Sequence, residues 1–345
     1  MKRYILSLKY KFRYYSDPRL WGYLSSKIKK FRQLQYEEKL KSFGSLNPNL
    51  TFYVIRRRPP AWGLFSNIFY VIQGIIYAEK NNYIPVVDME NYWVGELSSV
   101  KKINGTYNAW CYLFEQISDY SLDEVYKSRN VILSNGSSIL GRDHWLVLKN
   151  YDLITNPESL KLTGKLVSKY IRMNNVTKNF FNLTKSGLDW DGNHTLGIFV
   201  RGGNYYFNAG TRKQDVPSFD FLVKEIHNIM EENQLKKIYI CTENFRFFTK
   251  LSNALQNYSI HSNLRYPEHL TLETWDSQQK LTFDNSILMG YEKSLIYLTE
   301  VLLLSECAFT ISTNSNASTF ALCLNNLSVG DHRLVFDTTT TRIKM

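Results

Sequence analysis

The segment GIFVRGGNYY, residues 197–206, runs from an apolar strand pattern directly into an arginine, two glycines and an asparagine. The apolar run begins near His194, and residues 194–200 have the composition of a buried β-strand. Glycines directly behind a strand-end cation leave backbone N–H groups open to a ligand. We therefore expect a sheet whose strands carry a binding site at their carboxyl ends.

The chain downstream alternates helical and strand patterns. A helix is expected over residues 217–233, with Ser218 as its cap and one apolar face made of Leu222, Ile226, Ile229 and Met230. The further elements that we expect are strands at 236–242 and 308–312 and helices at 243–255, 290–306 and 316–326. Strands separated by helices of this length favour a parallel sheet covered on both faces.

The same alternation occurs upstream. A strand is expected at residues 51–56, a helix at 66–80 capped by Ser66 or Asn67, and a second strand at 83–89. A short helix and a strand at 130–134 follow, and a polar helical stretch at 158–182 connects the two halves. With 345 residues, the chain is long enough for two domains. We place their boundary near residue 185.

Basic charge is concentrated at the beginning of the chain. The formal net charge is +11, and residues 1–60 alone hold fifteen Lys and Arg against three acidic residues. In residues 1–45, aromatic and aliphatic side chains alternate with cations, as in a helix that lies on an anionic membrane surface. A solvated basic arm is an equal alternative, and nucleic acid is not expected as a partner.

No apolar run reaches the length of a membrane-spanning helix, and the first residues lack the pattern of a secretory signal. We expect a cytoplasmic protein that is peripheral on the inner face of the cell membrane if residues 1–45 dock there. The four cysteines and six histidines are scattered without metal-ligand spacing, so neither a disulfide framework nor a metal site is expected. The acidic pair in DWD, residues 189–191, precedes a strand and is typical of a turn.

Three strand ends carry residues suited to an anionic ligand. Arg201 presents a planar fork for phosphate or carboxylate, and Arg212 and Lys213 follow in the same loop. Thr242 and Glu243 follow the next strand, where the carboxylate can accept hydrogen bonds from a nucleobase or a sugar. The segment 311–319 leads into a helix whose N–H groups can receive phosphate. The competing interpretations are an ion pair, a helix cap and a polar loop.

Five segments resemble a known family. They are residues 60–92, 108–134, 196–206, 239–244 and 297–326, and they are similar to bacterial polysaccharide-cluster proteins of the fucosyltransferase superfamily, which includes nodulation α1,6-fucosyltransferases and protein O-fucosyltransferases. The resemblance covers about residues 50–330. It implies a GT-B arrangement of two Rossmann-like α/β domains with parallel sheets and a cleft between them. Residues 1–50 would form the basic arm, 51–185 the acceptor-side domain, and 186–345 the domain that holds the nucleotide sugar.

The resemblance also assigns roles. Arg201 would bind the diphosphate of the donor, GDP-fucose, and Glu243 would contact the guanine. Gly63 and Asn67 would face the cleft from the first domain. Ser315 and Asn316 would correspond to the polar pair that holds the phosphate and the sugar. The other candidate substrate-binding residues come from the strand ends themselves: Gly202, Gly203, Asn204, Arg212, Thr242, Asn314 and Ser318. The reaction would be fucosyl or hexosyl transfer to a glycan or lipid-linked glycan in capsule or O-antigen assembly, with neither a metal nor a cofactor.

The sequence departs from the family pattern at three positions, and it also lacks the carboxylate that some members carry just beyond Asn204. Phe199 replaces a histidine, Gly202 replaces a second arginine, and Asn204 replaces an aspartate. Asp215 is the candidate general base, although a residue just before Val216 and Pro217 is also typical of a turn. Two alternatives stay open: a degenerate protein that binds nucleotide sugar or glycan without turnover, and a membrane-docked assembly factor.

Overall fold

The computed structural model of the chain describes residues 38–57, 63–94, 97–136, 157–200, 217–242, 245–261, 290–325, 331–336 and 339–342. The chain separates into two compact units and passes between them at residues 145–146, 168–169 and 178–179. The first unit comprises residues 1–145 and 169–178, and the second comprises 146–168 and 179–345. The domain limits drawn from the sequence, and their GT-B arrangement, stay predictions.

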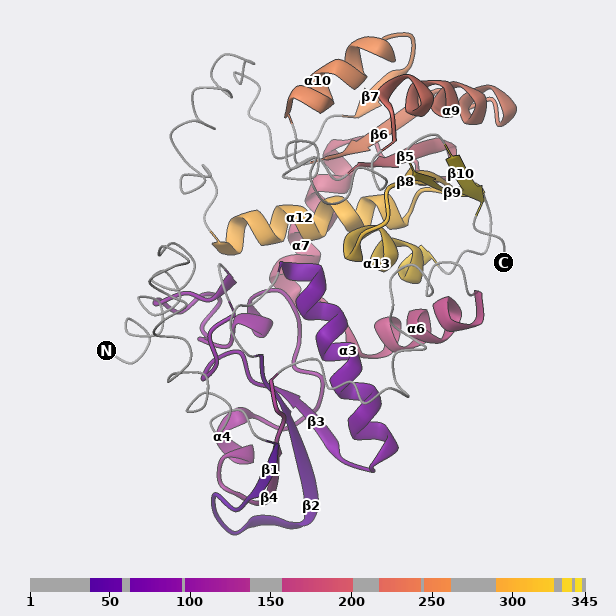
Figure 1. Ribbon diagram of the computed structural model, residues 1–345. Helices are drawn as coiled ribbons and strands as arrows, with labels where there is room; N and C mark the ends of the chain where they lie inside the picture. The colour runs from indigo at the N-terminus through magenta and orange to yellow at the C-terminus, as the bar shows by residue number, and fades with distance from the viewer. Residues whose placement is uncertain are drawn as a thin grey trace, which may run out of the picture. The chain divides into compact units, whose positions relative to one another are not determined.

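The first unit is built on a four-stranded sheet with the strand order β1-β4-β2-β3 (Figure 1). Its strands are β1 (Lys39–Lys41), β2 (Leu46–Ile55), β3 (Ile84–Val87) and β4 (Ser128–Leu133). β2 pairs in parallel with both β3 and β4, whereas β1 joins the edge of β4 in the antiparallel direction. The helices α3 (Leu64–Lys80) and α4 (Leu122–Val125) lie on opposite sides of the sheet.

The side chains of β2 point alternately to the two faces of the first sheet, and helices cover both faces. Phe52 and Val54 point to the face packed by α4, in a cluster that includes Val125. Ile55 points to the other face, where Gly74 of α3 approaches so closely that a Cβ there would lie 2.7 Å from the Ile55 side chain. Since successive strand residues face opposite sides, a strand buried on both faces has to be apolar at nearly every position.

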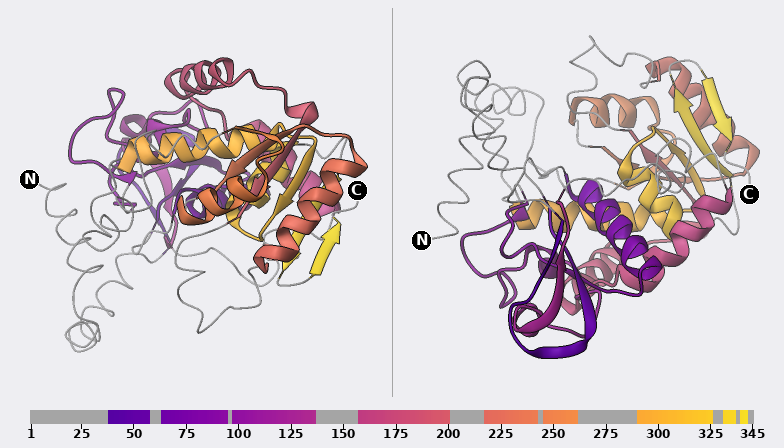
Figure 2. Two further views of the ribbon diagram at one scale, coloured as in Figure 1. Left: turned by 90° about the horizontal axis from the view of Figure 1, so that it is seen from above. Right: turned by 60° about the horizontal axis from the view of Figure 1, so that its bottom comes forward.

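The second unit contains a six-stranded sheet with the order β10-β9-β8-β5-β6-β7. Its strands are β5 (Thr195–Phe199), β6 (Lys237–Cys241), β7 (Ser259–His261), β8 (Phe309–Ser312), β9 (Asp331–Phe336) and β10 (Thr339–Arg342). All neighbours pair in parallel except β9 and β10, which form an antiparallel pair at the edge of the sheet (Figure 2). The sheet is therefore open and mostly parallel.

Helices cover both faces of this second sheet. One face is packed by α9 (Phe219–Glu232) and α10 (Phe245–Ala254), and the other by α12 (Gly290–Ser305) and α13 (Asn316–Asn325) (Figure 1). Leu196 and Ile198 of β5 point to the α9 side and share its buried cluster. Gly197, between them, points to the α12 side, where a Cβ would lie 2.7 Å from Leu304 Cδ1 and 2.9 Å from Cys307 Sγ.

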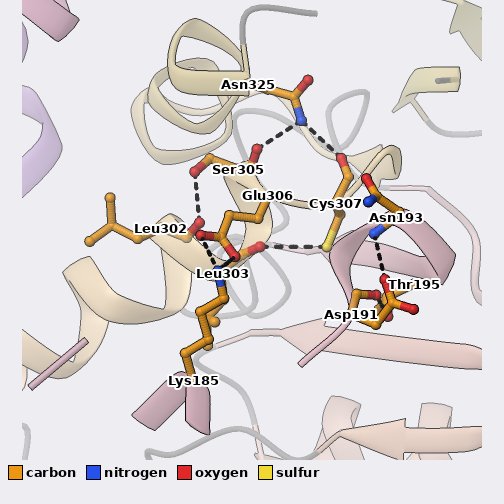
Figure 3. A network of polar contacts seen from close by, with 10 residues as sticks. All are labelled: Lys185, Asp191, Asn193, Thr195, Leu302, Leu303, Ser305, Glu306, Cys307 and Asn325. Carbon is orange, nitrogen blue, oxygen red and sulfur yellow. Dashed lines mark hydrogen bonds and ion pairs between the residues drawn. The ribbon is translucent and has the colours of Figure 1, made fainter. Parts of the chain in front are cut away.

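A network of polar contacts fixes the turn that joins α12 to β8 (Figure 3). Asn325, the last residue of α13, donates hydrogen bonds to the backbone oxygens of Ser305 and Cys307 at 2.8 and 2.9 Å. Lys185 pairs with Glu306 at 2.7 Å in the same turn. The carboxyl end of α13 is thus tied to the chain segment that enters β8, which fixes α13 relative to the sheet.

The helical stretch that follows the first sheet and precedes the second along the chain is interrupted. It consists of α6 (Pro157–Tyr170) and α7 (Asn175–Gly187), separated by residues 171–174. Asn174 ends the interruption: its side-chain oxygen accepts a hydrogen bond from Thr177 N at 2.9 Å, and its amide nitrogen donates to Cys111 O at 2.9 Å. The other elements in the described ranges are the short 3-10 helices η2 (Ala109–Tyr112) and η4 (Gly192–His194).

Most of the expected elements are present. Ser218 caps α9, and the four apolar residues named on its face are buried. The expected cap of α3 was wrong, because the helix begins earlier and Gly63 is its N-cap residue. Asp189 lies in a turn with φ 46°, as expected for DWD, and the four cysteines are free thiols, of which Cys111 is only partly buried. In the described ranges, no helix combines the length and apolarity needed to cross a bilayer.

Replacing Gly197 with alanine is expected to destabilise the second unit. The added methyl group would collide with Leu304 and Cys307, and overpacking of this kind costs about 1–3 kcal/mol in the free energy of unfolding. Gly187→Ala is the matched control, since a Cβ there meets no atom within 4 Å, and it should leave stability unchanged or raise it by up to about 1 kcal/mol. Urea denaturation measures both variants. Equal stabilities would show that α12 does not pack on β5 as described.

Candidate functional site

The carboxyl ends of three neighbouring strands lie at one level in the second sheet. Phe199, the last residue of β5, is the register partner of both Cys241 in β6 and Ser312 in β8. Beyond these strands, Thr313 N donates to Phe199 O at 2.9 Å and Val200 N donates to Cys241 O at 3.2 Å. The first residues after each strand are therefore held in line by backbone hydrogen bonds.

Polar side chains occupy this edge. Thr242 follows β6 and is 2% exposed, and Thr313 follows β8 and is 3% exposed. The two are separated by the width of β5, because β5 lies between β6 and β8. Backbone and hydroxyl groups, with apolar strands behind them, form the described part of the site.

The segment from Thr313 to Ser318 turns directly from β8 into α13. Ser315 Oγ accepts a hydrogen bond from Ser318 N at 3.1 Å, and Ser318 Oγ accepts one from Ser315 N at 3.0 Å. This reciprocal arrangement is a variant of the capping box. Ser318 Oγ also donates to Thr313 O at 2.8 Å, so its hydroxyl is committed to holding the turn.

The N-terminus of α13 faces the end of the sheet with positive partial charge. The helix has ten residues and no acidic residue in its first turn, so no carboxylate of its own neutralises the helix dipole. Asn314 and Asn316 lie in the turn and are partly exposed. The buried Asn314 Oδ1 accepts no hydrogen bond from the described residues. Helix-end N–H groups and amide side chains are suited to an oxyanion.

The sequence-predicted residues divide into three groups. Thr242, Asn314, Ser315, Asn316 and Ser318 lie together on the carboxyl edge of the second sheet. Gly63 and Asn67 belong to the first unit, at the start of α3. The others lie outside the described residues, and they are Arg201, Gly202, Gly203, Asn204, Arg212, Asp215 and Glu243. The binding or catalytic role of every one of these residues stays a prediction.

Sequence reasoning missed a buried polar cluster at the carboxyl edge of the first sheet. Arg56 follows β2 directly, is 2% exposed, and donates to Ser134 O and, at 3.0 Å, to Tyr92 Oη. Asp88 follows β3, is fully buried, and accepts a hydrogen bond from Tyr126 Oη at 2.6 Å. Burial and the Asp88 carboxylate raise the pKa of Tyr126 well above its usual range, so its hydroxyl keeps its proton.

Arg57 is the next residue and is also buried, at 7% exposure. Its guanidinium carbon lies 4.3 Å from the centre of the Tyr70 ring of α3, and burial lowers its pKa. Burial also raises the pKa of Tyr70 to about 12. The signal for both arginines was present in TFYVIRRR, since a cation directly after an apolar strand is the same pattern that singled out Arg201.

A buried carboxylate in the second unit was missed as well. Glu300 lies within α12 and is fully buried, and its backbone oxygen accepts a hydrogen bond from Tyr239 Oη at 3.4 Å. The acidic residue inside the apolar run LIYLTEVLLL was the available signal. Over the ranges that the structure describes, no three His, Cys, Asp or Glu side chains are grouped so that they could hold a metal ion.

Comparison with known proteins finds similarity of fold. No protein-family model matches the chain, and no curated protein matches it in sequence. Among solved structures, the NodZ α-1,6-fucosyltransferase soaked with GDP-fucose matches 86% of this chain and 99% of its own, with a TM-score of 0.50 and 14% identity. The Bradyrhizobium NodZ structure gives 0.48 at 13% identity over the same shares of the two chains. Arabidopsis thaliana FUT1 in complex with GDP gives 0.48 at 11% identity over 94% and 80%.

The similarity to the NodZ structure with the TM-score of 0.50 supports a shared α/β fold with parallel sheets. At 14% identity, the NodZ match describes the course of the chain and leaves the chemistry of the side chains open. Fold similarity and the polar edge of the second sheet are two separate observations.

Ser318→Ala is expected to lower the free energy of unfolding by about 1–3 kcal/mol, because the change leaves Ser315 N and Thr313 O without their partner in a buried turn. Ser186→Ala, at an exposed position of α7, is the matched control and should change stability by less than about 0.5 kcal/mol. Thermal unfolding followed by circular dichroism compares the two. A Ser318→Ala protein as stable as the control would contradict the described turn.

Proposed function

We propose that the chain is a glycosyltransferase that transfers a sugar, fucose in the first instance, from a GDP-linked donor to a glycan acceptor. The observation that supports this most directly is the polar edge where β5, β6 and β8 end beside the N-terminus of α13. In open parallel α/β sheets, nucleotides bind outside the carboxyl ends of the strands. The resemblance of five sequence segments and the fold similarity to NodZ both favour a fucosyltransferase.

The chemistry follows from the charge that develops on the leaving group. When the bond from the anomeric carbon to the donor's diphosphate breaks, the diphosphate gains negative charge. The N–H groups at the start of α13 would stabilise that charge, together with the guanidinium of Arg201 in its proposed role. Because these groups can neutralise the leaving diphosphate, we propose that the reaction needs no metal ion.

The acceptor hydroxyl has to lose a proton to a general base, and the residue at the end of β5 cannot be that base. Phe199, where the family often has a histidine, is 2% exposed and carries no titratable atom. Asp215 is the base that we propose, since it belongs to the same loop as Arg201. If Asp215 does not act as the base, the protein would bind its donor without turnover. This is the second candidate function, and the residues Phe199 and Asn204 favour it.

The biological setting belongs to the same proposal. We place the reaction in the assembly of a surface polysaccharide such as capsule or O-antigen, with a glycan or lipid-linked glycan as acceptor. The basic, aromatic residues 1–45 would hold the protein at the anionic inner face of the membrane, close to a lipid-linked acceptor.

A panel of nucleotides and nucleotide sugars tests the donor. GDP and GDP-fucose should raise the Tm of the full chain, since a ligand that binds only the native state stabilises it by about 2.7 kcal/mol at a hundredfold excess over Kd. UDP and UDP-glucose have the same diphosphate and a different nucleobase, so they serve as controls and should give smaller shifts in Tm. Stabilisation by UDP alone would refute a GDP-linked donor.

Arg201→Ala tests the role of the predicted cation. We expect transfer from GDP-fucose to fall by about a hundredfold or more, the loss measured when one donor to a developing anion is removed, and GDP to bind more weakly. Arg129→Ala, which removes an exposed arginine of β4, is the control and should keep full activity. Full activity of Arg201→Ala would contradict the proposed role of Arg201. GDP binding by the wild-type chain without transfer or donor hydrolysis would support the second candidate function.

A further inference from the structure

Exposed apolar side chains gather at one edge of the first unit. In the described ranges, six large apolar side chains are exposed, and three of them, Leu40, Phe43 and Leu46, fall within seven consecutive residues. Their exposed fractions are 63%, 39% and 46%. Single exposed apolar residues are common on protein surfaces, whereas a group of them marks a site of interaction. Residues 39–46, which include β1 and the start of β2, are termed the β1 edge.

Backbone hydrogen bonds hold the β1 edge on the sheet. β1 pairs with β4, and beyond β1 the N–H groups of Phe43 and Gly44 donate to Ser128 O at 3.0 and 3.2 Å. Leu46 N donates to Lys127 O at 3.0 Å. Gly44 passes so close to β4 that a Cβ there would lie 2.2 Å from Lys127 O. The backbone that carries the three apolar side chains is therefore fixed against the rest of the sheet.

The three side chains surround the edge instead of forming one stripe. β1 is the outermost strand of its sheet, and in the part of the chain that the structure describes no strand pairs with its outer side (Figure 1). Leu40 shares a face with its register partner Ile132, whereas Phe43 packs edge-on against Tyr126 at the end of α4, with ring centroids 5.0 Å apart. A partner helix needs its contacts along one groove, so this arrangement fits a deformable surface better.

Cations accompany the apolar side chains. Lys39 and Lys41 are exposed, and the Lys41 ammonium lies 5.9 Å from the centre of the Phe43 ring. Both carboxylate oxygens of the preceding Glu38 accept hydrogen bonds from tyrosine hydroxyls. Before it come residues 1–37, which hold ten Lys and Arg against two acidic residues. Exposed apolar groups beside cations are the composition of a surface that binds anionic lipid.

A second copy of the chain fits the β1 edge poorly. Two β1 strands paired in antiparallel fashion around Leu40 would place Lys39 of each copy opposite Lys41 of the other. Like charges directly opposite one another destabilise a sheet, and lysine on an edge strand opposes edge-to-edge pairing. Lipid headgroups, in contrast, can rearrange around both cations. The charge of the β1 edge therefore favours an anionic bilayer over a second copy.

We propose that the β1 edge is a membrane-docking surface, on which the three apolar side chains enter the interface of an anionic bilayer and Lys39 and Lys41 contact its headgroups. The inference deepens the proposed function and rests on it for the membrane setting, whereas the surface itself rests on the geometry of the first unit. Because a strand of the sheet makes the contact, docking sets the orientation of the first unit. β3, at the opposite edge of the sheet, faces away from the bilayer.

Partition of the full chain onto vesicles tests this surface. The vesicles are phosphatidylcholine with or without phosphatidylglycerol, and flotation over a lipid titration measures binding. We expect the wild type to prefer the vesicles with phosphatidylglycerol. The double variant Leu40→Asp, Leu46→Asp should bind them more weakly by about tenfold or more, since it removes apolar surface from the bilayer and adds negative charge. Leu162→Asp, Leu183→Asp is the matched control at exposed leucines of α6 and α7, and it should bind as the wild type does.

Equal binding of the two folded double variants would overturn the inference. So would a wild-type chain that binds neither kind of vesicle, or that binds both kinds equally. Sedimentation without lipid examines the other occupant: a dimer of the wild type that Leu40→Asp, Leu46→Asp dissociates would show that the β1 edge joins two copies, which also contradicts the proposal.

A charge variant decides the matter if Leu40→Asp, Leu46→Asp does not fold. Lys39→Gln with Lys41→Gln should weaken binding to the anionic vesicles by about tenfold, and Lys161→Gln with Lys165→Gln, at exposed positions of α6, is its control. Equal binding of these two variants contradicts the surface. GDP binding is measured separately in solution. A chain that docks through the β1 edge and binds no GDP refutes the proposed function alone, and a chain that binds GDP and does not dock refutes the docking surface alone.

Discussion

The second unit depends on one constraint, which is that β5, β6 and β8 run in parallel and end at the same level. Phe199 is paired with both Cys241 and Ser312, so the residues that follow all three strands lie along one edge. Parallel strands need crossover helices, and α13 therefore begins directly beyond the edge at which β8 ends. A helix N-terminus beside a row of strand-end amides and hydroxyls is a direct consequence of this topology.

Close packing keeps that edge in place. Gly197 leaves room for the side chains of Leu304 and Cys307 to pack closely on β5, and Asn325 ties the carboxyl end of α13 to the turn before β8. The amino end of α13 is held by the reciprocal bonds of Ser315 and Ser318. Because α13 is fixed at both ends, its first N–H groups are preorganised, which is what stabilisation of a developing anion requires.

Periodicity predicted most of the fold. Strands buried on both faces and helices with one apolar face stand out in a sequence, and α9 with its cap at Ser218 is the clearest case. The antiparallel edge strands β1 and β10 were missed, because exposed edge strands such as β1 lack an apolar pattern. The start of α3 was misplaced since Ser and Asn are the common caps, whereas here Gly63 takes that position.

The position of the candidate site could be predicted from sequence only where polar residues follow a strand. Thr242 and residues 314–318 were selected as candidates because they follow apolar runs, and Arg56 and Arg57 follow such a run too. The surroundings of the two arginines were not predictable. Sequence cannot tell an arginine with hydrogen-bond partners, such as Arg56, from one that is buried beside a ring face, such as Arg57. The loop that contains Arg201, Arg212 and Asp215 lies outside the described residues, so its contribution stays a prediction.

A crystal structure of the full chain with bound GDP tests the central claim most directly. We expect density for the diphosphate against the N–H groups of Asn316 and Ala317 at the start of α13, with the Arg201 guanidinium on the same phosphates. A diphosphate bound away from the carboxyl edge of β5, β6 and β8, or an Arg201 side chain turned into the core, would contradict it.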